Sequence, residues 1–329
     1  MTLGKESQIK IQFIIVTWNR QDQLKECLHS LVSLCRSSHK ILVVDNASDD
    51  GTLDMIKNQF PQVLLIENDK NMGFSKANNL GIKFVSENNI NSKYTIFFNN
   101  DASLIDNSIE NLIEYLDQND EVKAAIPAVF LDEQIFQIGI GGYNLSLKTA
   151  FSYFFGFSIL FPRKIKGIFF DQKYFFKKRL IVEVDWISGV CLVLRSELLK
   201  AHVKFPEDYF MYAEDVAFGQ EIQKFGKLIY FPFTRIQHGR KDNTSEYRKN
   251  LQTMWIQSLF QHYFSMQNKH FRSLKLCIFK LIFLGGFFLR LVLYSIIPNL
   301  KKTKMQEQTP GLKIYCSYIL KNLFRSQKQ

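Results

Sequence analysis

The feature that most constrains this fold is a regular alternation of short apolar runs with helix-like segments in the N-terminal third of the chain. The apolar runs are rich in branched and aromatic residues and read as strands at 10–16, 40–44, 63–66 and 94–98. Helical spacing of apolar residues predicts helices at 21–35, 53–60 and 76–88, the last capped by Ser75. The sequence therefore predicts an α/β fold, with helices on both faces of a mostly parallel sheet.

Three of the predicted strands end abruptly in polar residues. The first ends at Thr17, the second at Asp45, and the fourth runs into Asn99, Asn100 and Asp101. Ligands of open α/β sheets bind outside the carboxyl ends of the strands, so we expect these side chains to line one crevice. Taken alone, Asn-Asn-Asp is more typical of a turn than of a site. The alternation that precedes it is what favours a site.

The known phosphate-binding loops are missing from the sequence. Neither GxGxxG after the first strand nor GxxxxGK[ST] occurs anywhere. A nucleotidyltransferase would require a glycine-rich phosphate loop after the first strand and is therefore disfavoured. Any nucleotide must be held in another way.

The alternation continues beyond residue 101. A helix is predicted at 107–118, a strand at 122–125, a strand–turn–strand at 182–194 with Trp186 and Gly189 in the turn, a helix from Glu214 to Gly226, and a strand at 227–231 leading to His238. Glu214 and Asp215 open their helix. Two acids in a first helical turn also complement the helix dipole, so a purely structural role is an alternative reading.

Residues 143–180 form an excursion with a different composition. Residues 151–176 contain eleven aromatic side chains, and residues 163–179 contain seven basic ones. We expect an irregular loop near a membrane surface. A partly buried loop with a solvated charged rim is the alternative.

The net charge of +11 is unevenly distributed along the chain. Residues 1–239 contain 26 Lys and Arg against 28 Asp and Glu, whereas residues 240–329 contain 16 against 3. Such asymmetry indicates an anionic partner for the C-terminal part only. No recognised nucleic-acid-binding motif accompanies the charge, so we expect an anionic membrane and not nucleic acid.

The C-terminal part, residues 241–329, is predicted to be helical. Residues 251–264 have a helical apolar pattern, and residues 274–300 are strongly apolar but interrupted by charges. Only nine uncharged residues separate Lys280 from Arg290, too few for a span of about 20 residues. We expect helices that lie in or against the membrane interface. A helical subdomain packed on the sheet, or a transmembrane hairpin, are the alternatives.

Cysteine usage and the N-terminus both favour the cytosol. Five cysteines without CxxC spacing cannot all pair, which favours reduced thiols. Residues 1–10 are polar and lack the apolar core of a signal peptide.

Six stretches of residues 10–240 resemble, in order, the inverting nucleotide-sugar glycosyltransferases with the GT-A fold (family 2 type). They are residues 14–19, 43–52, 71–82, 98–101, 185–189 and 210–216. The resemblance is strongest to rhamnosyltransferase-like bacterial members that build surface polysaccharide. It implies a GT-A domain over residues 1–240 with a helical, membrane-associating appendage at 241–329.

The resemblance also implies roles for individual residues. The donor-binding residues would be Thr17, Asn19, Asp45, Asn46, Gly73, Lys76, Asn78 and Asn100. Asp101, helped by His238, would bind a divalent cation, Mg²⁺ or Mn²⁺, on the diphosphate. Asp215 would be the general base beside Glu214, with Trp186 and Gly189 on the acceptor side.

The sequence departs from the family pattern at two positions that bear on these roles. The metal element reads Asn-Asn-Asp, so Asp101 is its only carboxylate, and Lys76 stands where the family often has a small residue. Lys76 is either a phosphate contact or a solvated side chain, and a lone His238 has an equally ordinary structural reading. One carboxylate plus phosphate oxygens suffices for a hard ion that keeps several waters.

The chemistry of these residues fits an inverting transfer. A cation would stabilise the charge that grows on the diphosphate, and a carboxylate would take the acceptor's proton. The expected function is transfer of a sugar, rhamnose being one candidate, from a nucleotide-diphosphate donor to a glycan or lipid-linked acceptor. We place it at the cytoplasmic face of the plasma membrane. The alternative is a non-catalytic nucleotide- or glycan-binding scaffold.

Overall fold

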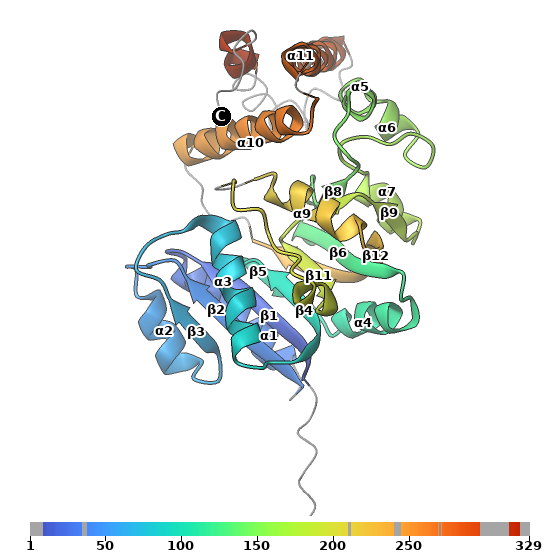
Figure 1. Cartoon of the computed structure of the whole chain (residues 1–329). Coiled ribbons are helices and arrows are strands. Elements are labelled where there is room, and N and C mark those ends of the chain that lie inside the picture. Colours follow the sequence, from blue (N-terminus) through green and yellow to red (C-terminus); the bar gives the residue numbers. More distant parts are fainter. Residues whose placement is uncertain are drawn as a thin grey trace, which may run out of the picture. The chain divides into compact units, whose positions relative to one another are not determined.

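The structure is a computed structural model. It describes residues 9–34, 38–209, 212–239, 245–268, 270, 272–296 and 316–322. The chain divides into two compact units (Figure 1). The first comprises Met1–Gly141, Gln172–Phe210 and Glu214–Arg240, and the second comprises Gly142–Asp171, Met211–Ala213 and Lys241–Gln329.

The first unit is built on one large mixed sheet. Its strands lie in the order β3 (Leu64–Glu67), β2 (His39–Asp45), β1 (Ile9–Thr17), β4 (Ser92–Phe98), β11 (Cys191–Arg195), β6 (Val122–Asp132), β12 (Lys227–His238) and β5 (Ala102–Leu104). Strands β3, β2, β1 and β4 are parallel, whereas β11 and β5 run antiparallel to their neighbours. Short strands β7 (Ile135–Phe136) and β9 (Val182–Val184) pair with β6 and β12. The predicted mostly parallel sheet is confirmed.

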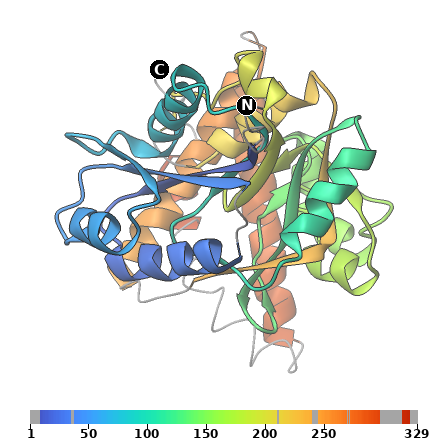
Figure 2. The same ribbon diagram turned by 90° about the horizontal axis from the view of Figure 1, so that it is seen from below.

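Helices cover the sheet on both of its faces (Figure 2). They are α1 (Gln21–Leu34), α2 (Thr52–Gln59), α3 (Gly73–Glu87), α4 (Ile109–Gln118), α7 (Gln172–Lys177), α8 (Glu197–Lys200) and α9 (Glu214–Gln223). Apolar side chains at helical spacing face inward; in α1 these are Leu24, Leu28 and Leu31, none of which is exposed. The central strands are buried almost completely, as expected for strands covered on both faces.

Some local predictions were wrong. Helix α3 begins at Gly73, so Ser75 lies buried inside the helix and is not its cap. Trp186 belongs to the short strand β10 (Trp186–Ile187) and not to a turn. Residues 151–176 are not wholly an irregular loop, because half of them lie in α7 and in two helices of the second unit. Their aromatic residues pack on neighbouring segments that local periodicity does not reveal.

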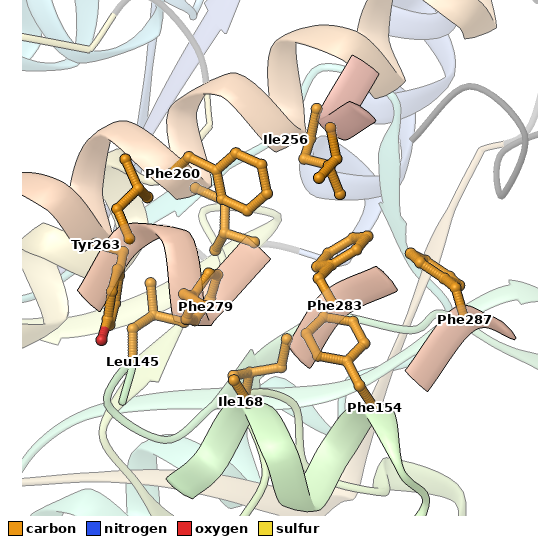
Figure 3. Close-up of a cluster of buried hydrophobic side chains, with 13 residues drawn as sticks. Leu145, Phe154, Ile168, Ile256, Phe260, Tyr263, Phe279, Phe283 and Phe287 are labelled. Atoms are coloured by element: carbon orange, nitrogen blue, oxygen red, sulfur yellow. The ribbon is translucent and has the colours of Figure 1, made fainter. Parts of the chain in front are cut away.

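The second unit is helical. It contains α5 (Leu147–Phe154), α6 (Phe157–Leu160), α10 (Ser245–Ser265), α11 (Arg272–Ile296) and a short helix at 316–321. Strand β8 (Gly141–Gly142) lies where the chain first passes from one unit to the other. The core of this unit joins α5 to α10 and α11 through an aromatic cluster that includes Phe154, Phe260 and Phe283 (Figure 3).

Among the described residues, four cysteines are free thiols, namely Cys27, Cys191, Cys277 and Cys316. The fifth, Cys35, lies outside the described part of the chain. Within the helices that the structure describes, none is both long and apolar enough to cross a membrane.

Candidate functional site

The carboxyl ends of β1 and β2 place their polar residues side by side. Parallel pairing puts Thr17 directly opposite Asp45. The fourth strand joins them, because the Asn100 side-chain amide donates a 2.9 Å hydrogen bond to Thr17 Oγ1. The side chains expected to meet at one edge of the sheet therefore do so.

Asp45 is buried, and its carboxylate organises the loop after β2. The backbone N–H of Ser48 donates to Asp45 Oδ2 at 2.9 Å, and the Ser48 hydroxyl donates to Oδ1. Ser48 Oγ in turn accepts a 2.9 Å bond from the Asn19 N–H, and Asn19 Oδ1 accepts a 2.8 Å bond from the Asp49 N–H. The loops that follow the first two strands are thus held together.

Asn46 ties this loop to the start of α3. Its amide donates to the carbonyl of Gly73 at 3.3 Å and its carbonyl accepts from Asn68 at 3.0 Å. Gly73 has φ of 79°, a left-handed conformation that a glycine adopts without strain. Asn46 and Gly73 therefore lie in the same network as Asp45.

Two other predicted donor-binding residues lie elsewhere on α3. Asn78 is buried, and its amide donates to the Phe74 carbonyl one turn earlier, at 3.0 Å. Lys76 is exposed to solvent on the outside of the helix. The structure brings neither side chain into the hydrogen-bond network around Asp45.

Asp101 and His238 are brought together by strand register. Antiparallel pairing of β5 with β12 places His238 opposite Ala102, the residue after Asp101. His238 Nε2 lies 2.9 Å from Asp101 Oδ1, and the Gly239 N–H donates to the Asp101 carbonyl at 2.6 Å. Burial raises the pKa of Asp101, but the hydrogen bond and charge of His238, with Arg20, outweigh it and leave that pKa below its ordinary value.

The second ring nitrogen of His238 is held by Gln137. Nδ1 donates to Gln137 Oε1 at 2.7 Å, so Nε2 is the nitrogen turned toward Asp101. Gln137 is itself held through its backbone, since its N–H donates to Val129 and its carbonyl accepts from the Gln172 amide at 2.7 Å. Asn99 completes the surroundings with its amide nitrogen 3.1 Å from Nε2.

The Asp101–His238 pair has the donor chemistry and spacing for two ligands of one divalent ion. Neighbouring ligands in an octahedral shell with bonds of about 2.1 Å lie about 3 Å apart, close to the 2.9 Å between Oδ1 and Nε2. Within the described residues, no group of three or more His, Cys, Asp or Glu side chains gathers to hold a metal.

Glu214 and Asp215 begin helix α9, where the Val216 N–H donates to Asp215 Oδ1 at 2.9 Å. Glu214 is buried, and no hydrogen-bond partner for its Oε2 occurs in the described part of the chain. Burial, with the adjacent Asp215 charge, raises the pKa of Glu214 to about 8. Burial likewise raises the pKa of Asp215 to about 6. The two carboxyl groups therefore titrate nearer to neutrality than ordinary acids do.

Close packing fixes the position of this helix start. A Cβ on Gly219 of α9 would lie 2.8 Å from the Asp185 carbonyl oxygen and from Trp186 Cα, so only glycine permits this approach. Trp186 is buried beneath the helix. Gly189 serves a similar purpose, since a Cβ there would lie 2.7 Å from the Phe74 ring. The structure therefore shows packing roles for both predicted acceptor-side residues.

Sequence reasoning missed Ser48 and Gln137. Ser48 follows Asp45 by three residues, a spacing typical of a loop that satisfies a strand-end carboxylate, so it could have been found. Gln137 carried no signal, because it stands in a short segment 101 residues from its partner His238.

Comparison with known proteins places this fold among sugar-transferring enzymes. Residues 12–179, just over half of the chain, match the family described as "Glycosyl transferase family 2". The chain is 25% identical over 246 residues to an N-acetylglucosaminyl-diphospho-decaprenol L-rhamnosyltransferase of Mycobacterium tuberculosis, which covers 70% of this chain and 76% of that protein. It is 24% identical over 244 residues to rhamnosyltransferase WbbL of Escherichia coli, which covers 73% and 87% respectively.

Solved structures share the fold at lower identity. A mannosyltransferase from Pyrobaculum calidifontis, in complex with GDP-Man and Mn²⁺, superposes with a TM-score of 0.59 at 15% identity, covering 97% of this chain and 88% of its own. S. aureus TarS 1–349 in complex with UDP-GlcNAc superposes with a TM-score of 0.51 at 14% identity, covering 96% and 89%. The predicted GT-A arrangement is confirmed by these similarities.

Proposed function

This chain belongs to glycosyl transferase family 2 and is a glycosyltransferase of the rhamnosyltransferase-like kind, and from that premise we propose its reaction. It transfers a sugar, with rhamnose as the first candidate, from a nucleotide-diphosphate donor to a glycan or lipid-linked acceptor, with inversion, in surface polysaccharide synthesis. The observation that carries the proposal is the Asp101–His238 pair beside the Thr17–Asp45 network, at the carboxyl edge of the sheet.

In this proposal the donor lies over the ends of β1 and β2. Thr17, Asn19, Asp45 and Asn46 shape the site for the nucleoside, and Asn100 connects it to the diphosphate side. The buried carboxylate of Asp45 already bonds Ser48, so its main contribution is to hold the loop in shape. Two relatives by fold support a donor of this class, since they were solved with GDP-Man and UDP-GlcNAc.

Asp101 and His238 would hold a divalent cation, Mg²⁺ or Mn²⁺, in this site. The ion would supply positive charge to the diphosphate as it leaves. Asp101 contributes a hard oxygen ligand that stays ionised at neutral pH because its pKa is lowered. His238 contributes a nitrogen ligand whose direction is set by Gln137. Solved relatives by fold that contain Mn²⁺ support this choice of ion.

Asp215 acts as the general base. Its carboxylate takes the proton of the acceptor hydroxyl while the oxygen forms a bond to the anomeric carbon, and the bond from that carbon to the diphosphate breaks on the opposite face. A base is most effective with a pKa near the working pH, and burial raises the pKa of Asp215 in that direction. Glu214, held beside it with a higher pKa, remains largely protonated and positions the acceptor or sugar.

The acceptor is proposed to be a glycan on a polyprenyl diphosphate. The name of the M. tuberculosis relative specifies such an acceptor, N-acetylglucosaminyl-diphospho-decaprenol. An acceptor that is anchored in lipid requires the enzyme to work at a membrane, and a nucleotide-sugar donor places the reaction on the cytoplasmic face. The chain would therefore contact an anionic membrane peripherally.

The proposal is tested first by donor binding. The folded protein is incubated with dTDP-, UDP- and GDP-sugars, with and without Mn²⁺, and its melting temperature is measured. We expect one donor to stabilise the protein only when the ion is present, and Asp101→Asn to abolish that gain. Glu207→Gln, which changes an exposed carboxylate elsewhere, is the control. No stabilisation by any donor would contradict the proposal.

Turnover then separates an enzyme from the scaffold alternative. The donor identified by stabilisation is supplied with a short-chain polyprenyl-diphosphate glycan, and product is detected by mass spectrometry. Transfer by the wild type and its loss in Asp215→Asn are the expected results. Full transfer by the Asp215→Asn variant would contradict the assignment of Asp215 as the general base.

A further inference from the structure

We propose that the second unit binds anionic membranes through one continuous apolar surface formed by the α5–α6 segment and one side of α11. The surface consists of the exposed residues Phe151, Phe157, Ile159, Leu160, Phe161, Leu274, Ile278, Leu281 and Phe288. We call it the apolar surface. It deepens the peripheral membrane contact of the proposed function, on which the choice of partner rests, while its binding is measured without any sugar transfer.

The α5–α6 segment exposes five large apolar side chains within eleven residues. Their exposed fractions run from 41% at Phe157 to 71% at Leu160. Single exposed apolar side chains are normal on a protein surface, but a cluster of this density marks a contact site.

The exposure is a property of the fold, because the segment is fastened at its base. The hydroxyl of Ser152 donates to the carbonyl of Lys166. A Cβ on Gly167 would lie 2.4 Å from Ser158 Oγ, so the chain that returns after α6 packs directly against that helix. Gly142 packs still closer, since a Cβ there would overlap the Ile168 carbonyl oxygen. These contacts hold the segment as a closed loop, with the tip at residues 159–161 exposed.

Helix α11 is apolar on two sides. One side, with Phe279, Phe283 and Phe287, is buried in the aromatic cluster of the second unit (Figure 3). The other side exposes Leu274, Ile278, Leu281 and Phe288, which with Gly285 recur at steps of four, three, four and three residues. A helix that is apolar all round lies in a core or in lipid, and here one side already occupies the core.

The two exposed regions are joined by ring contacts. Gly285 lies in the exposed stripe of α11, and a Cβ there would be 3.2 Å from the Phe155 ring. Phe155 stacks on Phe151 with ring centroids 4.5 Å apart, and Phe151 stacks on Phe157 at 5.9 Å. The apolar surface is therefore continuous from α11 to α6. Gly285 allows it, since a larger residue would push Phe155 away.

Charge identifies the occupant as an anionic membrane. The second unit contains 19 of the 42 basic residues but only 4 of the 31 acidic ones. Residues 142–170 contain no acid at all, and the exposed side chains of Lys148, Arg163, Lys164 and Lys166 accompany the apolar tip. A second copy would bring these like charges together, whereas anionic head groups attract them.

The geometry favours a helix lying in the interface. No described helix qualifies as a membrane span. Helix α11 carries the partly exposed Arg272 and Lys275 in its first turn, whereas Lys280 is buried and donates to the Asn322 carbonyl. Apolar side chains that enter the acyl region, combined with lysines and arginines at the head groups, are the two signals that stable peripheral binding requires. The apolar surface supplies the first and the basic residues supply the second.

The test is co-sedimentation of the full-length protein with vesicles. Vesicles of phosphatidylcholine alone are compared with vesicles of phosphatidylcholine and phosphatidylglycerol. We expect clearly stronger binding to the anionic vesicles than to the neutral ones, and a loss of about tenfold in partitioning for each of Leu160→Ser and Phe288→Ser. Ile138→Ser, which changes an equally exposed apolar residue of the first unit, is the matched control and should bind like the wild type.

Further measurements separate the possible failures. Each variant is checked for an unchanged melting temperature, which is expected because the altered side chains are exposed. Unchanged partitioning by both Leu160→Ser and Phe288→Ser would overturn the proposal. A wild-type dimer in light scattering that becomes monomeric in these variants would also overturn it, in favour of a second copy. Transfer to a water-soluble acceptor should be unaffected; absence of transfer with intact vesicle binding would count against the proposed function alone.

Discussion

At the scale of single residues, the site depends on a short chain of contacts around His238. Asp101 Oδ1 lies 2.9 Å from Nε2 of the ring, and Gln137 Oε1 lies 2.7 Å from Nδ1. A hydrogen bond to the second nitrogen of a histidine ligand fixes the tautomer and the direction of the ring. This strengthens metal binding by the first nitrogen. Gln137 is thus a positioning residue for the proposed ion.

Replacing Gln137 by leucine should weaken binding of Mn²⁺ about ten- to a hundredfold, the usual effect of removing such a partner. Calorimetric titration of Mn²⁺ in the presence of nucleoside diphosphate measures this directly. Gln137→Glu should restore much of the affinity, because it keeps an acceptor for Nδ1. Gln59→Leu, at an exposed helix end, is the control. Equal Mn²⁺ affinity in Gln137→Leu and the wild type would contradict the positioning role.

The acid limb of the pH profile should report the general base. Burial raises the pKa of Asp215 to about 6, and a base works only when it is deprotonated. We therefore expect kcat/KM to fall about tenfold per pH unit below that value and to level off above it. Asp215→Asn should reduce kcat/KM by about a hundredfold or more and abolish this limb. An unchanged acid limb in that variant would show that another group controls the rate.

At the scale of elements, helix α9 carries both acids and is held by close contact with the chain around β10. Gly219 lies against Asp185 and Trp186 with no room for a side chain. The distance between helix and strand therefore sets where Glu214 and Asp215 stand, five and four residues earlier along the helix.

Gly219→Ala should destabilise the protein by about 1–3 kcal/mol, because the added methyl group meets backbone atoms at 2.8 Å. Activity should fall by more than the loss of folded protein accounts for, because the added methyl group displaces the helix that carries Glu214 and Asp215. Denaturant unfolding and initial rates measure the two effects. Glu221→Ala on the same helix removes only an exposed ion pair with Lys224 and should change stability by less than about 0.5 kcal/mol. Equal effects of the two substitutions would contradict the packing argument.

At the scale of the whole molecule, charge separates the two units. The second unit has a net charge of +15 by formal count, while the rest of the chain is slightly acidic. At physiological salt, the attraction between basic side chains and anionic lipid is largely screened beyond about 8–10 Å. The free energy of burying apolar side chains is not screened by salt in this way. Binding through the apolar surface should therefore combine a salt-sensitive part with a salt-resistant part.

Raising the salt concentration to about 1 M, where the Debye length shrinks to about 3 Å, should reduce vesicle binding but not eliminate it. Arg163→Gln with Lys164→Gln should lower binding at low salt and leave the high-salt value unchanged. Leu160→Ser should lower both values. Vesicle co-sedimentation across a salt series measures this, with Lys57→Gln in the first unit as the charge control. Complete release of the wild type at high salt would argue against apolar insertion.

The sheet could be predicted because its signals are local. A strand is identified by its own run of apolar residues, and its end is identified by the polar residue that follows within a few positions. Thr17 and Asp45 followed from strand ends alone and do lie opposite each other. Helix α3 was placed three residues too late, because Ser75 looks like a cap and the helix begins at a glycine with positive φ.

The details of the site could not be predicted, because they depend on register between distant segments. His238 meets Asp101 across 137 positions, and Gln137 meets His238 across 101. A bulge between Phe231 and Arg235 also shifts the register of β12 against β6. No periodicity in the sequence encodes such a shift.

The sequence by itself therefore determined the α/β alternation, the carboxyl edge at which Asp101 stands, and the basic character of the C-terminal part. Local periodicity and composition depend only on neighbouring residues, so they can be determined from the sequence without a structure. Only the tertiary structure decided that residues 142–171 pack with α11, and which aromatic side chains are left exposed. Burial depends on partners far along the chain, and the same Phe-rich stretch contains both the buried Phe154 and the exposed Phe151.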